Sequence, residues 1–167
     1  MVDAVLTTSR LWLRPLELSD AAFLVRLNAD PLVVRFTGDV PFATLEHAEV
    51  VVRELHVQWR DRGLGRLGVV ERRSERLIGW CGLKWHESEE AVDLGFRFLR
   101  SVWGQGFATE AGAACLARAQ ERGLRVFARA DLRNAASVRV LEKLAFHQDI
   151  SGIDAEGFAR FHWSPAR

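Results

Sequence analysis

The chain of 167 residues has no tyrosine, and it has only two cysteines and two lysines. Without tyrosine, no phenol side chain can act as an acid or a base in its chemistry. Cys81 and Cys115 each lie in an apolar segment, which is typical of buried free thiols. The five histidines are scattered, and none is spaced from another histidine or cysteine as metal ligands are. The sequence therefore predicts no metal site.

A strong net charge and long apolar runs are also missing. The formal net charge is +1, which gives no electrostatic reason to expect a nucleic acid or an anionic membrane as partner. No apolar run reaches the length that spans a bilayer, and the first seven residues lack the basic and apolar regions of a secretory signal. We therefore expect a cytoplasmic protein, with residues 1–167 forming one domain around one core.

Hydrophobic periodicity predicts alternating strands and helices. Strands are expected over residues 9–14, 67–72, 76–84, 91–99, 125–130, 146–150 and 157–163. Helices are expected from the cap at Ser19 and Asp20 to residue 30, from Thr44 to Gly63, over 107–122, and from Asn134 to residue 144. Residues 31–43, with Gly38 and Pro41, are expected to form a loop. The buried stripe of the helix that begins after Thr44 is expected to consist of Leu45, Ala48, Val52, Leu55 and Trp59.

The strand–helix–strand unit over residues 91–130 predicts a parallel strand pair with a right-handed crossover. The other strands have short connections, which favour antiparallel pairing. On strand 91–99 the apolar residues fall on one face, and Asp93, Gly95 and Arg97 fall on the other. The expected fold is therefore a mixed sheet with helices on its faces.

A glycine-rich turn, Ser101-Val-Trp-Gly-Gln-Gly-Phe-Ala-Thr-Glu-Ala111, joins a predicted strand to a predicted helix. The first amides of a helix have no intrahelical acceptor, and the helix dipole adds positive charge, so this layout favours phosphate groups. Glycine at 104 and 106 lets the backbone approach a ligand closely. An ordinary tight turn is the alternative, because short glycine patterns are weak signals. The chain lacks the lysine of a P-loop, and Thr109 stands where the dinucleotide fingerprint needs a small residue.

Residues 92–111, Val-Asp-Leu-Gly-Phe-Arg-Phe-Leu-Arg-Ser-Val-Trp-Gly-Gln-Gly-Phe-Ala-Thr-Glu-Ala, resemble the acetyl-CoA motif of GNAT N-acetyltransferases, and more narrowly of their RimJ/RimL-like branch. Residues 131–146, Asp-Leu-Arg-Asn-Ala-Ala-Ser-Val-Arg-Val-Leu-Glu-Lys-Leu-Ala-Phe, resemble the Asn-x-x-Ser and Leu-Glu-Lys-Leu-Gly-Phe segment of that branch. Residues 76–83 and 8–16 are similar to its central hairpin strand and its first strand. Two departures stand out: Trp103 replaces Gln or Arg of the broad motif, and Ala145 replaces glycine. If residue 145 is left-handed, alanine there costs about 1 kcal/mol.

The resemblance implies an α+β (mixed α/β) GNAT fold: a central, mostly antiparallel sheet with one splayed parallel strand pair, flanked by about four helices. It also implies acetyl-CoA as co-substrate, with the pantetheine arm between strands 91–99 and 125–130. The cofactor-binding residues that it implies are Phe98, Leu99, Arg100, Trp103, Gly104, Gln105, Gly106, Phe107, Ala108, Thr109 and Asn134.

Acetyl transfer to an amine needs a proton acceptor, a stabilised carbonyl oxygen and a leaving thiolate. Asp93 stands where the branch often carries glutamate, so the resemblance implies that it accepts the proton through water; a solvent-facing or salt-bridged carboxylate is the alternative. Ser137 would lie near the sulfur and donate to the thiolate, or have no catalytic duty. Asn134 would contact pantetheine, cap its helix, or do both. His86 either borders the acceptor pocket or lies in a surface turn.

These implications describe an enzyme that transfers acetyl directly to a primary amine, first of all a protein or peptide N-terminus. The alternative acceptor is a small-molecule amine or an aminoglycoside-like drug. Loop 29–43 and hairpin 147–160 are expected to form the acceptor wall, and their charges do not indicate a polycation. The acids there are Asp30, Asp39, Asp149, Asp154 and Glu156, and they are offset by Arg35 and Arg160. The resemblance suggests a homodimer. A non-catalytic acyl-CoA-binding or regulatory module and a nucleotide-binding domain are the alternative classes.

Overall fold

The structure is a computed structural model that describes residues 4–38, 42 and 44–164. Its strands are β1 (Leu6–Thr7), β2 (Leu11–Pro15), β3 (Arg66–Glu71), β4 (Arg76–His86), β5 (Ala91–Phe98), β6 (Val126–Ala130), β7 (Phe146–Ile153) and β8 (Ala159–Trp163). Its α-helices are α1 (Ala21–Ala29), α2 (Pro31–Val34), α3 (Leu45–Arg62), α4 (Phe107–Glu121) and α5 (Ala135–Lys143). Single turns of 3-10 helix lie at Leu18–Asp20, Glu87–Glu89 and Arg100–Val102.

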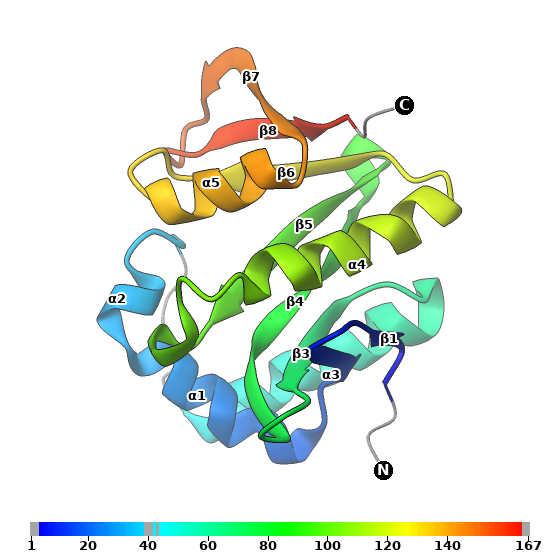
Figure 1. Cartoon of the computed structure of the whole chain (residues 1–167), viewed down its shortest axis with the longest axis vertical. Coiled ribbons are helices and arrows are strands. Elements are labelled where there is room, and N and C mark those ends of the chain that lie inside the picture. Colours follow the sequence, from blue (N-terminus) through cyan, green and yellow to red (C-terminus); the bar gives the residue numbers. More distant parts are fainter. Residues whose placement is uncertain (1–3, 39–41, 43, 165–167) are drawn as a thin grey trace.

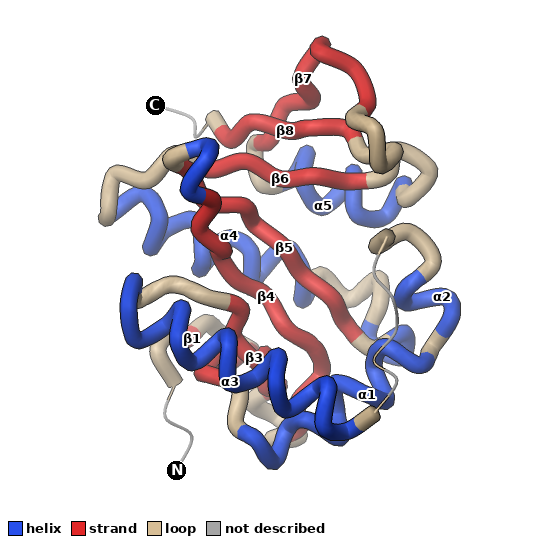
Figure 2. The backbone as a smooth tube through the Cα atoms, turned by 180° about the vertical axis from the view of Figure 1, so that it is seen from behind, coloured by secondary structure: helices blue, strands red, loops and turns tan. Residues whose placement is uncertain are grey.

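The strands form one mixed sheet in the order β1-β2-β3-β4-β5-β6-β8-β7. Only the β5–β6 pair is parallel among the described strands, and all other neighbours are antiparallel. Helices α4 and α5 cover one face of the sheet, and α1 and α3 cover the other (Figures 1 and 2). This arrangement confirms the predicted mixed, mostly antiparallel sheet with one parallel strand pair, with five helices where about four were expected.

A hydrophobic cluster fills each side of the sheet. The larger one joins the sheet to α4 and includes both cysteines, which are buried and free as predicted. The smaller one joins α1 and α3 to the start of the sheet around Leu16, Leu24 and Val52. Because apolar side chains leave water on both faces, the central strands are held firmly between two helical layers.

Several local predictions are confirmed by the backbone. Thr44 caps α3, because its hydroxyl accepts a hydrogen bond from the amide of His47 at 3.2 Å. Gly63 ends that helix in the left-handed region at φ 60°. Ala145 also lies in that region, at φ 63°, where alanine is strained.

Other local predictions are wrong. Residues 31–34 form helix α2 instead of a loop, because Pro31 is preset for a first helical turn and Asp30 accepts the amide of Leu32 at 3.0 Å. The remainder of the predicted loop is only partly placed, since 39–41 and 43, with Asp39 and Pro41, lie outside the described residues. The predicted stripe of α3 is also too long: Ala48 and Val52 are buried, but Leu45 is 49% exposed.

The predicted cap of the first helix is likewise not made by a side chain. Asp20 occupies the cap position of α1 without a capping hydrogen bond, and its carboxylate instead binds Arg14 at 2.6 Å and the amide of Glu17 at 2.8 Å. No helix in the described part of the chain combines the length and the apolar character needed to cross a membrane.

Candidate active site

The sheet opens between β5 and β6. Strand β5 pairs with β4 at eight register positions, but with β6 at only two, Val92 with Val126 and Asp93 with Phe127. Beyond Asp93 the two strands diverge (Figure 1). A cleft of about 1120 Å³ occupies this region, and residues from β5, β6, α5 and the glycine turn line it. The splayed parallel pair that the sequence predicted is therefore present.

The glycine turn closes one end of this cleft. Gly104 and Gly106 have φ values of 76° and 82°, which glycine adopts without strain, and Gly106 is the N-cap of α4. The indole of Trp103 donates to the carbonyl of Phe98 at 2.9 Å, so the turn is fixed to the end of β5. Arg10 donates to the carbonyl of Gln105 at 2.9 Å. These two hydrogen bonds fix the turn. The first amides of α4 therefore have a fixed position, at the positive end of the helix dipole.

Glu110, in the first turn of α4, ties that helix to the chain before β2. One carboxylate oxygen accepts from the hydroxyl of Thr8 at 2.6 Å and from the amide of Arg10 at 2.9 Å, and the other binds the Arg10 guanidinium at 2.6 Å. Burial alone would raise the pKa of Glu110, but hydrogen bonds from Thr8, Arg10 and Ser9 outweigh burial and lower it to about 2. The carboxylate is therefore charged at neutral pH, and it anchors the wall that carries the glycine turn.

Most of the residues that the sequence predicted for cofactor binding line the cleft. Those that do are Phe98, Trp103, Gly104, Gly106, Phe107, Ala108, Thr109 and Asn134. The side chain of Arg100 turns instead to Asp30, at 3.2 Å, and Leu99 packs against the smaller core. Gln105 bonds within the turn, to the carbonyl of Ser101 at 3.3 Å. These three residues are not among those that line the cleft.

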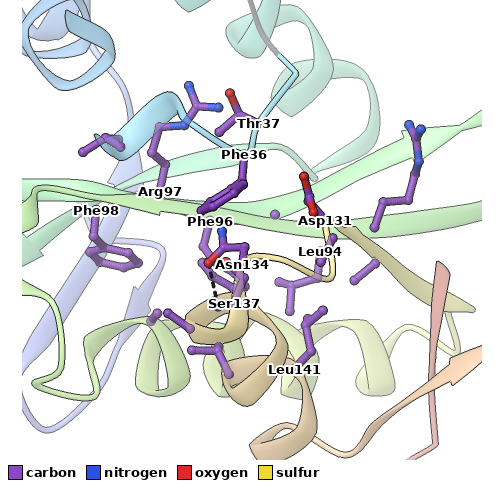
Figure 3. A pocket seen from close by; sticks show the side chains of 18 of the residues that line it. Phe36, Thr37, Leu94, Phe96, Arg97, Phe98, Asp131, Asn134, Ser137 and Leu141 are labelled. Carbon is purple, nitrogen blue, oxygen red and sulfur yellow. Dashed lines mark hydrogen bonds between the residues drawn. The ribbon is translucent and has the colours of Figure 1, made fainter. Parts of the chain in front are cut away.

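Helix α5 supplies a second wall. The side-chain oxygen of Asn134 accepts the amide of Ser137 at 3.2 Å, which confirms the predicted helix cap (Figure 3). Both residues line the cleft, opposite apolar side chains of β5 such as Phe96. Capping uses the oxygen of Asn134, so its NH₂ group is the part that can serve a ligand. Asp131, before the helix, is held by Arg133 at 2.6 Å.

Asp93 lies at the apex of the cleft, where β5 and β6 part. Its two carboxylate oxygens have different partners: Oδ2 is 2.6 Å from Nη2 of Arg66, and Oδ1 is 2.8 Å from Nε2 of His86. Burial by itself would raise the pKa of Asp93, but the charge and hydrogen bond of Arg66 and the contact with His86 outweigh burial, and the pKa lies below its ordinary value. Asp93 is thus salt-bridged, which was the alternative to its role as proton acceptor, and it lies inside the cleft.

The Arg66 guanidinium occupies space that the missing side chain of Gly95 leaves open. Its guanidinium lies where a Cβ at Gly95 would be, since the ideal Cβ would come within 2.7 Å of it. Nη1 donates to the carbonyls of Gly82 and Asp93, and the guanidinium lies 5.4 Å from the ring of Trp80. Sequence reasoning missed Arg66. A signal was available, because glycines inside two predicted strands, at 82 and 95, mark places where another group approaches the backbone closely.

His86 does not lie in a surface turn. It is the last residue of β4, its side chain is 33% exposed, and it lines the cleft beside Asp93. The ring of Phe127 on β6 meets the imidazole edge-on at 5.3 Å. The position was noted from the sequence, but its pairing with Asp93 depends on the register of β4 and β5, which the sequence does not give.

Charged residues around the cleft are mostly basic. The basic residues that line it are Arg35, Arg66, Lys84, Arg97, Arg129, Arg133, Arg139 and Lys143, and the acidic ones are Asp93, Asp131 and Glu156. Several are paired, for example Arg129 with Asp154 at 2.5 Å. The excess of positive charge suits an anionic ligand. Within the described residues, no group of three or more His, Cys, Asp or Glu side chains is placed to hold a metal ion.

Comparison with known proteins identifies the arrangement. The family model of the acetyltransferase (GNAT) domain matches residues 10–147. An uncharacterized N-acetyltransferase of Bacillus licheniformis, p20, is 26% identical over 151 residues, which cover 86% of this chain and 83% of that protein.

Two solved structures have the same fold. One is RimL, a ribosomal alpha-N-protein acetyltransferase in complex with coenzyme A, with a TM-score of 0.75, 16% identity, and coverage of 92% of this chain and 93% of that one. The other is a spermidine N-acetyltransferase from Vibrio cholerae in complex with CoA and spermine, with a TM-score of 0.74, 19% identity, and coverage of 92% and 94%.

Proposed function

Because the chain belongs to the GNAT acetyltransferase family, we propose that it binds acetyl-CoA and transfers the acetyl group directly to a primary amine. The observation that carries this proposal is the cleft itself, which begins where β5 leaves β6 and ends at the glycine turn. Pairing with β6 stops after Asp93, so backbone groups on that side of residues 94–98 face the cleft instead of a neighbouring strand.

Each part of acetyl-CoA has a matching wall in this proposal. The diphosphate is held by the amides between Trp103 and Glu110 at the start of α4. The pantetheine arm lies along β5 and bonds to the backbone near Phe98, while the NH₂ group of Asn134 reaches it from α5. The excess of basic residues around the cleft supports an anionic cofactor.

The chemistry needs no covalent enzyme intermediate. The amine nitrogen attacks the thioester carbonyl, a backbone N–H of β5 stabilises the oxygen as negative charge develops, and the C–S bond breaks. The proton that leaves the nitrogen is taken up at the end of the cleft where Asp93 lies, and the Ser137 hydroxyl donates a hydrogen bond to the departing thiolate. Cys81 and Cys115 are buried in the core and take no part.

For the acceptor, we favour the α-amine of a protein or peptide. RimL acts on a protein amine and the other structural relative on spermidine, so fold alone leaves both classes open. A polyamine is a polycation, and the charged side chains that line the cleft are mainly arginine and lysine, which repel it. Residues 35–38 on one side and Glu156 and Phe158 of the β7–β8 hairpin on the other line the cleft, which supports part of the predicted acceptor wall.

The test is release of CoA thiol from acetyl-CoA with a panel of amines, read together with the mass of the acetylated product. The panel contains peptides with free N-termini, spermidine and an aminoglycoside. We expect turnover with peptides, and loss of turnover in Asp93→Ala at unchanged CoA affinity. Binding of CoA without turnover on any amine would indicate the non-catalytic module, and tighter binding of ATP or NAD than of CoA would indicate a nucleotide-binding domain. Sedimentation of the whole chain tests the predicted homodimer.

A further inference from the structure

The environment of Asp93 makes it a poor proton acceptor. A general base works best when its pKa is close to the working pH. The pKa of Asp93 is lowered, because the charge and hydrogen bonds of Arg66 and His86 outweigh the effect of burial. Both of its oxygens are already engaged, one by Arg66 and one by His86. A carboxylate held in this way is better suited to orient a neighbour than to take a proton.

The neighbour that it orients is an imidazole. Asp93 accepts from Nε2 of His86, and in a neutral imidazole with the proton on Nε2 the other nitrogen, Nδ1, carries the lone pair. The edge contact with Phe127 fixes the plane of the ring from β6. His86 lines the cleft and is one-third exposed, so an amine or one intervening water can reach it.

Arg66 is the third residue of this group, after Asp93 and His86. Its guanidinium occupies the space left by the missing side chain at Gly95 and is bound to the backbone carbonyls of Gly82 and Asp93. It is therefore fixed independently of the carboxylate that it holds. The order Arg66, Asp93, His86 runs across three neighbouring strands, β3, β5 and β4, and ends in the cleft.

We infer that His86 is the proton acceptor of the transfer reaction and that Asp93 and Arg66 are its positioning residues. The inference rests on the proposed function and assigns a role within that same site. As the amine nitrogen forms its bond to the carbonyl carbon, one N–H proton passes to Nδ1 of His86, directly or through one water. The C–S electron pair leaves with the CoA sulfur, which takes a proton from solvent while the Ser137 hydroxyl donates a hydrogen bond to it. His86 then releases its proton to solvent, and the enzyme is restored.

The test compares wild type with His86→Gln, a change that keeps the size of the side chain but removes the basic nitrogen. We expect kcat to fall about 10²- to 10³-fold with unchanged CoA affinity. In wild type at saturating amine, kcat should fall at acid pH as one group of the bound complex becomes protonated, and this acid limb should be absent in His86→Gln. The charged groups around the imidazole are Asp93, Arg66, Lys84, Glu89 and Arg160, so the same profile is also measured for Asp93→Asn. That variant should lower kcat at unchanged CoA affinity, because the imidazole loses the carboxylate that holds it.

A matched control lies on the β7–β8 hairpin. His162 also contacts a carboxylate, that of Asp149, at 2.8 Å, but it is not among the residues that line the cleft. His162→Gln should keep kcat within about twofold, and the melting temperatures of all variants show whether each is folded. Activity within threefold of wild type in a folded His86→Gln, with the acid limb intact, would overturn the inference. Failure of wild type on every amine would instead overturn the proposed function.

Discussion

The two edges of strand β5 have opposite roles. Toward β4 it is paired at eight positions, and toward β6 at two. The first edge fixes the strand, and the second leaves most of it facing a cleft. The change comes at Asp93, the last residue paired with β6, so the charged cluster sits where the sheet stops closing. A cleft is thus made by ending a strand pairing early.

Disturbing the fully paired part of the sheet, where β4 lies against the start of β3, should have the largest effect. A Cβ on Gly82 would lie 2.1 Å from the carbonyl oxygen of Gly65 and 2.8 Å from Cα of Arg66, and backbone cannot move aside as a side chain can. We expect Gly82→Ala to lower the free energy of unfolding by about 3 kcal/mol or more in urea denaturation. The control is Gly65→Ala, where the nearest atom would be at an ordinary 3.7 Å. Equal stability of the two variants would contradict this account.

A substitution on β5 itself should act on the site more than on the fold. A Cβ on Gly95 would come within 2.7 Å of the Arg66 guanidinium, the flexible end of a side chain that can swing away. We expect Gly95→Ala to cost about 1 to 2 kcal/mol of stability, less than Gly82→Ala, because hydrogen bonds to a charged group are lost. The pKa of Asp93 should rise, and turnover should fall about 10- to 100-fold. Unchanged turnover in a folded variant would show that the reaction does not need the Arg66 guanidinium in its position beside Gly95.

Replacing Glu110 should weaken the contacts that fix the start of α4, and with it the glycine turn, to the chain before β2. At neutral pH, Glu110→Gln should lower stability by about 2 kcal/mol, because the hydrogen bonds are made to a charged carboxylate. The folded pKa is about 2 and the ordinary value is 4.5, so this stabilisation is complete above pH 4.5 and is lost as pH falls toward 2. Urea denaturation at several pH values should show the two proteins converging over that interval. Glu54→Gln, on the exposed face of α3, should change stability little at any pH.

The smallest expected effect is at the end of α5, the helix that forms the second wall of the cleft. Ala145 follows α5 with φ 63°, so Ala145→Gly should raise stability by about 1 kcal/mol by relieving left-handed strain. The matched control is Ala117→Gly on the exposed face of α4, where glycine should instead cost about 1 kcal/mol. Both are read from thermal or urea unfolding. A loss of stability in both variants would show that the backbone at 145 is not strained.

The two walls of the cleft, the glycine turn with α4 and the helix α5, also show what the sequence can and cannot predict. Periodicity and capping residues predicted most strands and helices, and the glycine turn predicted where the cleft lies. These signals could be used because each lies within a short stretch of sequence. Helix α2 was missed although Asp30 and Pro31 carry its signals, since the same pair also suits the end of α1. The cluster around Asp93 was not predicted as a unit: Arg66 is 27 residues away and lies two strands over, and only the strand register brings them together.

The two thiols of the larger core have a practical consequence for assays. Cys81 and Cys115 lie 3.9 Å apart with almost no exposed surface, and their mutual hydrogen bond and burial raise the pKa of Cys81 well above its ordinary value. Thiolate is the reactive form, so a disulfide reagent such as Ellman's should leave the native protein unlabelled. Colour that develops during turnover then measures released coenzyme alone, and two further equivalents per chain, appearing on addition of denaturant, would count how much enzyme had stayed folded.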